Sequence, residues 1–224
     1  MIRTSELYKR LVRDPNRVYE HRATVGGVVY DNSSIVSAKI KRMQYESFSV
    51  GNCCAATLNL SFIKTEDPPK MAEIVVESRV RVGDEASEYI PRGTFYINTR
   101  EESDGVLTVE AFDAVPKLEG LYFSTGEWED QSMLATVQEI AGRIGIEIDS
   151  RTTVSDTYMV RYPGDMTMRE VLCAIAAAHA GNWIVTAENK LLLLPLFSAP
   201  NETDYIVDEH GDAILIGGVR IRWR

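Results

Sequence analysis

Hydrophobic and polar residues alternate with a period of two through the first half of the chain. Such alternation predicts strands with one buried face, because successive side chains of a strand point to opposite sides. The segment ATLNLSFI alternates Leu58, Leu60 and Phe62 with Thr57, Asn59 and Ser61, and EIVVESRVRV sets Val80 and Val82 against Arg79 and Arg81. Several segments of this kind at short spacing between Val18 and Val115 predict an antiparallel β-barrel or sandwich.

Two glycine-containing turns predict hairpins within this region. Gly26-Gly27 interrupts the β-branched stretch ATVGGVVY, and Asp104-Gly105 closes the longer stretch YIPRGTFYINTREESDGVLTVEAFDAV. Both pairs favour a two-residue hairpin turn, whose central residues need positive φ. On either side of the second turn the inward positions are expected to be Phe95, Ile97, Leu107, Val109 and Ala111.

A short amphipathic helix is expected before the first strand. Leu7, Tyr8, Leu11 and Val12 recur at helical spacing, and Asp14-Pro15-Asn16 ends the pattern. So short a helix is marginal by itself. It is therefore expected to pack either on its own barrel or on another subunit.

After Pro116 the hydrophobic period changes from 2 to 3.6. Val137, Ile140, Ala141 and Ile144 predict a helix, Gly145 its C-terminal stop, and Ile146 and Ile148 a following strand. A second helix is expected to start at a capping box formed by Thr167 and Glu170. Its apolar face is expected to contain Val171, Leu172, Ile175, Ala178 and His179, with Gly181 ending it. Residues 183–186 and 190–194 should then pair, with the run Leu191 to Leu194 buried on both faces.

The change of period divides the chain into four segments and predicts an α+β fold. Residues 1–17 form an N-terminal helical arm, and residues 18–115 a β-barrel domain. Residues 116–197 form a small α/β domain with two helix–strand units. In residues 198–224 strand character returns, since Val219, Ile221 and Trp223 alternate with Arg220, Arg222 and Arg224. Either this last strand closes the fold, or the segment begins a second barrel in a native chain that continues beyond Arg224; the second alternative is favoured.

Composition narrows the class of protein. The chain has 224 residues, of which 45% are hydrophobic and 25% charged, as in ordinary globular proteins. No run approaches the ~18 apolar residues of a membrane span, and the N-terminus is too polar for a signal peptide, so folding in a cytoplasm is expected.

Cys53, Cys54 and Cys173 form no disulfide framework and are expected to be buried thiols. The net charge of −9 disfavours sequence-specific nucleic-acid binding.

The sequence shows no pattern of catalytic, cofactor-binding or metal-binding residues. His21, His179 and His210 have no metal-ligand spacing, and His179 is expected at a helix end. The acidic stretches EWED and TREESD are expected to be solvated, and no GxSxG, GxGxxG or GxxxxGK[ST] motif occurs. Trp128, Trp183 and Trp223 are expected in the core or an interface, and the three C-terminal arginines on a solvated or subunit-facing strand. A structural or assembly protein is therefore favoured over an enzyme.

Four motifs in order carry a resemblance to a known family. They are Gly93 to Ile97 (GTFYI), Glu110 to Leu118 (EAFDAVPKL), EIAGRIGIEI and MREVLCAIAAAHAGNWIV, and together they cover roughly Val18 to Leu196. The set resembles the baseplate hub or tail-associated proteins of long-tailed bacteriophages and prophages. AGNW stands where GGN is commoner in that family, and the C-terminal part has no matching motif.

The resemblance implies a barrel like that of tail tube subunits, then a small α/β domain and a second barrel. It implies a homotrimeric ring that joins the tail tube or distal tail protein to the tip, contacts the tape-measure protein and lets DNA through. The location would be the virion tail, after assembly in the bacterial cytoplasm. In this scheme Asp113 and Pro116 turn the chain out of the barrel, Asp113 as a capping or turn carboxylate.

Two other functions remain open at this point. One is a cell-wall-degrading hydrolase of the tail tip, which would need a carboxylate of raised pKa or a metal in a cleft. The other is a carbohydrate-binding β module, which would need exposed aromatic side chains on one sheet face. Tyr96 and Phe112 are the pair that could provide them.

Overall fold

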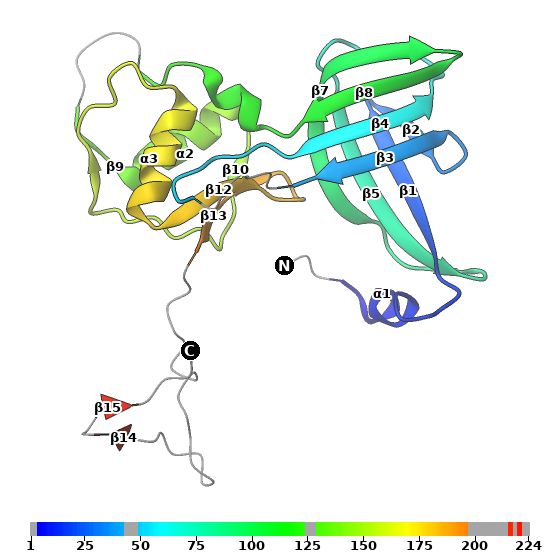
Figure 1. Cartoon of the computed structure of the whole chain (residues 1–224), viewed down its shortest axis with the longest axis horizontal. Coiled ribbons are helices and arrows are strands. Elements are labelled where there is room, and N and C mark those ends of the chain that lie inside the picture. Colours follow the sequence, from blue (N-terminus) through cyan, green and yellow to red (C-terminus); the bar gives the residue numbers. More distant parts are fainter. Residues whose placement is uncertain (1–3, 43–48, 124–128, 197–214, 217–218, 221–224) are drawn as a thin grey trace.

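The chain folds into a strand-rich domain and a smaller α/β domain that lie side by side (Figure 1). The structure is a computed structural model that describes residues 4–42, 49–123, 129–196, 215–216 and 219–220. Most of its sheet is antiparallel, and its helices belong mainly to the second domain. The predicted α+β class, with a barrel-like domain followed by a small α/β domain, is therefore confirmed.

The first domain is one rolled antiparallel sheet. Its strands are β1 (Val18–Val25), β2 (Val28–Asp31), β3 (Ile35–Lys41), β4 (Thr57–Ile63), β5 (Glu73–Val82), β6 (Glu85–Ala86), β7 (Ile90–Ser103) and β8 (Val106–Phe112). They pair in the order β2-β1-β5-β7-β8-β4-β3, and β6 pairs with the end of β5. Among the described residues no ladder joins β2 to β3, so the barrel is open along that side.

The alternation in the sequence matches the core of this sheet. Leu58, Leu60 and Phe62 are fully buried, as expected, and every position of β7 and β8 that was predicted to face inward is buried. These positions are Phe95, Ile97, Leu107, Val109 and Ala111. Both predicted hairpin turns are present, and Gly26, Gly27, Asp104 and Gly105 all have positive φ.

The N-terminal helix α1 (Glu6–Leu11) packs on its own barrel. The Ser5 side chain caps the helix by accepting from the Tyr8 N–H, and the Ser5 N–H and hydroxyl both donate to Glu88, at 2.7 and 2.6 Å. Arg10 forms an ion pair with Glu85 of β6. The sequence predicted that this helix packs on its own barrel or on another subunit, and the structure shows it on its own barrel.

The second domain contains two helices beside a three-stranded sheet. Its elements are η1 (Val115–Glu119), β9 (Gln131–Ser132), α2 (Met133–Ile144), β10 (Glu147–Ile148), β11 (Met159–Val160), α3 (Met168–Ala178), β12 (Gly181–Val185) and β13 (Lys190–Pro195). Strand β13 is central, parallel to β10 and antiparallel to β12, and β9 pairs with β11. The expected pairing of residues 183–186 with 190–194 is confirmed.

The predicted helix ends are largely confirmed. Gly145 ends α2 in the left-handed conformation, with φ of 72°. The capping box at the start of α3 is complete, because the Thr167 hydroxyl accepts from the Glu170 N–H and the Glu170 carboxylate accepts from the Thr167 N–H. These contacts satisfy backbone groups that a helix end leaves unpaired.

Three details of the second unit differ from the prediction. Gly181 does not end α3 but begins β12, where a Cβ would lie 2.9 Å from the Leu194 carbonyl oxygen. The glycine is needed for close strand contact, and Ala180 adopts the positive φ of the turn. Ala176, not Ala178, lies on the buried face of α3. Leu194 is 36% exposed, so only Leu191 to Leu193 of the leucine run are buried.

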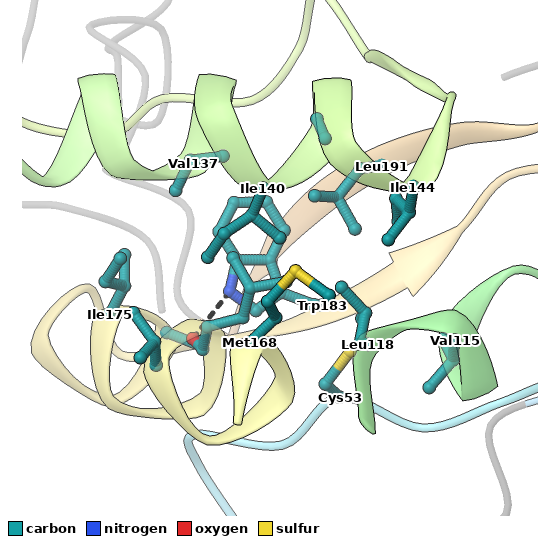
Figure 2. Packing of buried hydrophobic residues seen from close by; sticks show 14 of the residues in the cluster. Cys53, Val115, Leu118, Val137, Ile140, Ile144, Met168, Ile175, Trp183 and Leu191 are labelled. Carbon is teal, nitrogen blue, oxygen red and sulfur yellow. Dashed lines mark hydrogen bonds between the residues drawn. The ribbon is translucent and has the colours of Figure 1, made fainter. Parts of the chain in front are cut away.

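Trp183 is at the centre of the second core, between α2 and α3 (Figure 2). Its side chain is fully buried, and the indole N–H donates to the Leu172 carbonyl oxygen at 2.7 Å. Ile140 and Ile144 of α2 and Ile175 of α3 surround it. The indole therefore adds both a large apolar surface and a satisfied polar group to the core.

The C-terminal prediction is only partly covered by the described residues. Strands β14 (Leu215–Ile216) and β15 (Val219–Arg220) form an antiparallel pair. Arg222, Trp223 and Arg224, and most of the segment 198–224 expected to return to strand structure, lie outside the described residues.

Candidate functional site

Hydrogen bonds from the backbone and from side chains join the two domains at their junction. The chain reaches the α/β domain first between β3 and β4, where residues 49–56 run along it before returning (Figure 1). It crosses again from β8 into η1, through Asp113 and Ala114. The two crossings lie side by side, because Thr57 of β4 pairs with Phe112 of β8.

Asp113 fastens the two crossings to each other. Its N–H donates to the Ala56 carbonyl oxygen at 3.1 Å, and its Oδ2 accepts from the Ala56 N–H at 2.8 Å. Its Oδ1 accepts from the Val115 N–H at 3.0 Å, at the start of η1. The predicted turn and capping role of Asp113 is confirmed, and Pro116 stands in the first turn of η1 as expected. The contact to Ala56, 57 residues away in sequence, extends that role to a clamp between the domains.

The Asp113 carboxyl is buried, and burial raises its pKa to about 6. The two backbone N–H groups and the guanidinium groups of Arg42 and Arg169 act in the opposite direction. A carboxyl of raised pKa is a common mark of an active site. Here both oxygens already accept from backbone N–H groups, which is the arrangement of a structural cap.

Residues 51–53 extend the sheet of the α/β domain beside β12. The Gly51 N–H donates to the Gly181 carbonyl oxygen at 2.9 Å, and the Trp183 N–H donates to the Asn52 carbonyl oxygen at 2.7 Å. The Asn52 N–H is held by Oδ1 of Asn182, also at 2.7 Å. Cys53 is therefore buried in the second core although it lies between two strands of the first domain.

Gly51 is required for this insertion. Its φ is +82°, and a Cβ there would lie 2.8 Å from Cβ of Ala177 and 3.1 Å from the Cys173 carbonyl oxygen. A larger side chain would therefore push residues 49–53 off helix α3. The sequence offers one weak signal for the insertion, a glycine followed by small residues in GNCCAA, with no helix or strand period.

Side chains from both domains reinforce the junction. Arg169 of α3 donates from Nε to the Cys53 carbonyl oxygen at 3.0 Å and forms an ion pair with Glu119 at 2.7 Å. Lys117 of η1 places Nζ 3.6 Å from the centroid of the Tyr96 ring in β7. A cation over an aromatic face is attractive, so this contact also holds the domains together.

The histidines and cysteines have structural environments. His179 is at the C-terminal cap of α3, where Nδ1 lies 2.8 Å from the Ile175 carbonyl oxygen and Nε2 accepts from the Ser155 N–H at 3.0 Å. Of the three cysteines expected to be buried, only Cys53 is, whereas Cys54 and Cys173 are half-buried. Burial raises the pKa of the Cys53 and Cys173 thiols. The part of the chain that the structure describes contains no group of His, Cys, Asp or Glu arranged to hold a metal ion. His210 lies outside that part.

The remaining candidate residues are the acidic stretches, Trp128 and the aromatic pair Tyr96 and Phe112. The carboxylates Glu102 and Asp130 pair with Lys64 and Arg161 at the surface, while Glu127 and Trp128 lie outside the described residues. Tyr96 and Phe112 face each other across β7 and β8 but are half-buried, and Lys117 covers the Tyr96 ring. They therefore form no exposed aromatic platform for a sugar.

No helix within the described ranges is long and apolar enough to cross a membrane.

Comparisons with known proteins identify the fold. No protein-family model matches the sequence, and no curated protein matches it. Among solved structures, the 43 kDa tail protein of prophage MuSo2 from Shewanella oneidensis is similar over 88% of this chain, with a TM-score of 0.52 and 14% identity. A tail protein from Neisseria meningitidis MC58 is similar over 88%, with a TM-score of 0.51 and 11% identity.

The chain spans 61% of the length of the first of these proteins and 53% of the second. Because 88% of the chain is matched, the likeness includes parts of both domains. At these identities it establishes a shared fold. The fold of this chain is thus shared with a prophage tail protein and with a second tail protein.

Proposed function

We propose that this chain is a structural component of a phage or prophage tail, in a baseplate hub or tail-tip ring that connects the tail tube to the tip. The observation that carries the proposal is the fold shared over 88% of the chain with a prophage tail protein and with a second tail protein. The ordered motifs from GTFYI to MREVLCAIAAAHAGNWIV support the same family.

The contacts at the junction support a structural role in a ring, because they hold the two domains at a fixed angle. Two chain crossings, the Asp113 clamp, the Arg169 contacts and the Lys117–Tyr96 contact fix one domain against the other. A subunit that must keep a ring in register benefits from such a fixed angle, because a loose hinge would let each copy adopt a different orientation. In our proposal the role is structural and the chain performs no catalysis.

The proposed ring has three copies, forms part of the DNA channel, and contacts the tube or distal tail protein and the tape-measure protein. Its location is the virion tail, after assembly in the bacterial cytoplasm. The net charge of −9 suits a channel through which DNA slides without being held, since like charges repel.

Deletion of the gene from its phage or prophage tests the role. After induction, electron microscopy is expected to show heads without complete tails, and a plasmid copy of the gene should restore them. Normal tails and normal infectivity without the gene would contradict the proposal. Multi-angle light scattering of the purified full-length product tests the ring separately, and trimers are expected as the protein concentration rises. A monomer at every concentration would contradict the trimeric ring but not the role in the tail.

A further inference from the structure

The open side of the barrel forms a groove between β1 and β3. Strand β2 pairs with β1 only from Arg22 to Val25, so on that edge Val18–His21 pair with no strand in the part of the chain that the structure describes. Strand β3 pairs with β4 along one edge, and no ladder among the described residues uses its other edge. The groove between them has a volume of about 700 Å³.

The core-facing side of β3 is uncovered in this groove. Ala38 lies opposite Leu60 and Ile40 opposite Leu58, so these residues share the face that forms the barrel core. Leu58 and Leu60 are fully buried, whereas Ala38 is exposed and Ile40 is half-buried. The core of the barrel is therefore complete over β4 and incomplete over β3.

A side chain occupies part of the position that a neighbouring strand would take. Asn32 accepts from the His21 N–H through Oδ1 at 2.7 Å and lies with Nδ2 3.4 Å from the Tyr19 carbonyl oxygen. These are backbone groups on the open edge of β1. Proteins protect free strand edges because such edges pair readily with other chains. An incoming backbone can displace a single exposed amide side chain and take over both hydrogen bonds.

The groove has positive charge and no carboxylate among its lining residues. Arg92 lines it and also lines an adjoining hollow, together with Arg42, Ile40 and Ala187. Arg92 donates to the Ser78 hydroxyl, and Arg42 donates to the Arg92 carbonyl oxygen. Arg42 acts electrostatically on the buried Asp113 carboxyl, and among the described residues neither arginine lies within ion-pair distance of a carboxylate. On a chain of net charge −9, this basic lining is complementary to an acidic ligand.

We propose that this groove binds an extended acidic segment of a partner protein, which adds to the free edge of β3 as a strand. The backbone of the segment pairs with β3, an apolar side chain covers Ala38 and Ile40, and a carboxylate binds Arg92. Strand addition gives affinity through backbone hydrogen bonds and specificity through alternate side chains. The inference goes beyond the tail role and does not depend on it.

Binding of synthetic peptides to the full chain tests this proposal. The probe is a fluorescent peptide of sequence Thr-Val-Thr-Val-Thr-Glu-Thr, which places its valines and its glutamate on one face of the added strand. The control peptide replaces the glutamate by Gln. The acidic peptide is expected to bind about tenfold or more tightly than the control, as for a charge-assisted hydrogen bond. Hydrogen exchange should slow in residues 35–41 when it binds. Equal affinity for both peptides, or no binding up to about 1 mM, would overturn the proposal.

Substitution of Ala38 locates the site without disturbing the core, because this side chain is exposed. Ala38→Glu should abolish binding of the acidic peptide, and Ala38→Lys should strengthen it. Lys39→Gln is the matched control, because it changes the net charge by the same amount as Ala38→Glu but lies with Asn59 on the opposite face. It should leave binding nearly unchanged. Equal binding by Ala38→Glu and Ala38→Lys would place the peptide elsewhere and contradict the proposal.

Two further outcomes would assign the groove to a different occupant. Self-association that Ala38→Glu removes, without peptide binding, would show that a second copy fills it. Peptide binding that appears only after Asp204, Asp208 and Glu209 are changed to their amides would show that the chain's own acidic segment fills it. Either result would overturn the proposal of an acidic partner.

Discussion

The two domains complete their cores in different ways. The α/β domain takes residues 49–53 from between two barrel strands and packs them against β12 and α3, so that Cys53 and Trp183 are both buried. No comparable segment among the described residues covers β3 of the barrel, and Ala38 is exposed beside fully buried Leu60. The comparison shows that the connection between β3 and β4 completes the core of the α/β domain, whereas the described residues leave the core-facing side of β3 uncovered.

The largest expected effect comes from the closed core. Trp183→Ala should lower the free energy of unfolding by about 3–5 kcal/mol, because a large buried side chain leaves a cavity and the Leu172 carbonyl loses its donor. Urea denaturation followed by circular dichroism measures the change. A loss below about 1 kcal/mol would mean that Trp183 is not central to this core.

Substitution of Gly51 tests whether the inserted segment is held by close packing. Gly51→Ala should cost about 2–4 kcal/mol, since it adds both backbone strain and a clash with Ala177. Gly27→Ala is the matched control: its φ is also positive, at +94°, but a Cβ there meets nothing within 4 Å. The control should therefore lose only the strain contribution, about 1 kcal/mol. Equal losses in the two variants would contradict the packing argument.

The clamp at the junction should be sensitive to pH. Burial raises the pKa of Asp113 from 3.8 to about 6, so the folded chain holds this proton more tightly than the unfolded chain does. The stabilisation is fully present below about pH 4 and is lost as pH rises through 6, by roughly 3 kcal/mol. The measurement is the difference in unfolding free energy between the wild type and Asp113→Asn from pH 4 to 7.

That difference isolates Asp113 from the other titrating groups, because the amide does not ionise. The wild type should lose stability relative to Asp113→Asn as pH rises. A relative gain instead would show that the N–H groups of Ala56 and Val115 outweigh the burial of the charge.

The smallest expected effect is at the open face of the barrel. Ala38→Lys should change the unfolding free energy by no more than about 0.5 kcal/mol, because the side chain is exposed. Leu60→Ala, on the neighbouring position of the same face, should cost about 2–5 kcal/mol. If both substitutions were equally costly, the groove would be covered in the isolated chain and the contrast between closed and open parts would fail.

Local sequence signals predicted local structure well. Strand alternation, the Asp104-Gly105 turn and the Thr167–Glu170 capping box each involve residues within a few positions of one another, and the structure contains all three. Gly181 was assigned the wrong role because a glycine after a helix usually serves as its stop, whereas this one permits a close strand contact.

Contacts between distant segments were not predictable in the same way. Alternation of Val36, Ala38 and Ile40 with polar residues indicates a buried face, but burial requires an opposing element that the pattern of β3 does not reveal. The turn role of Asp113 follows from its residue type, whereas its partner Ala56 is distant in sequence. The sequence of residues 49–53 has neither helical nor strand periodicity, so only the structure shows that this segment inserts into the second domain.

The most direct test of the structural role is the location of the protein in assembled particles. Gold-labelled antibody against this chain, applied to purified particles from the parent phage or induced prophage, should mark the tail end farthest from the head. Mass spectrometry of the same particles should find the chain in a copy number of about three per tail, as a closed ring of three subunits requires. A chain found only in the soluble lysate, and absent from intact tails, would contradict the account.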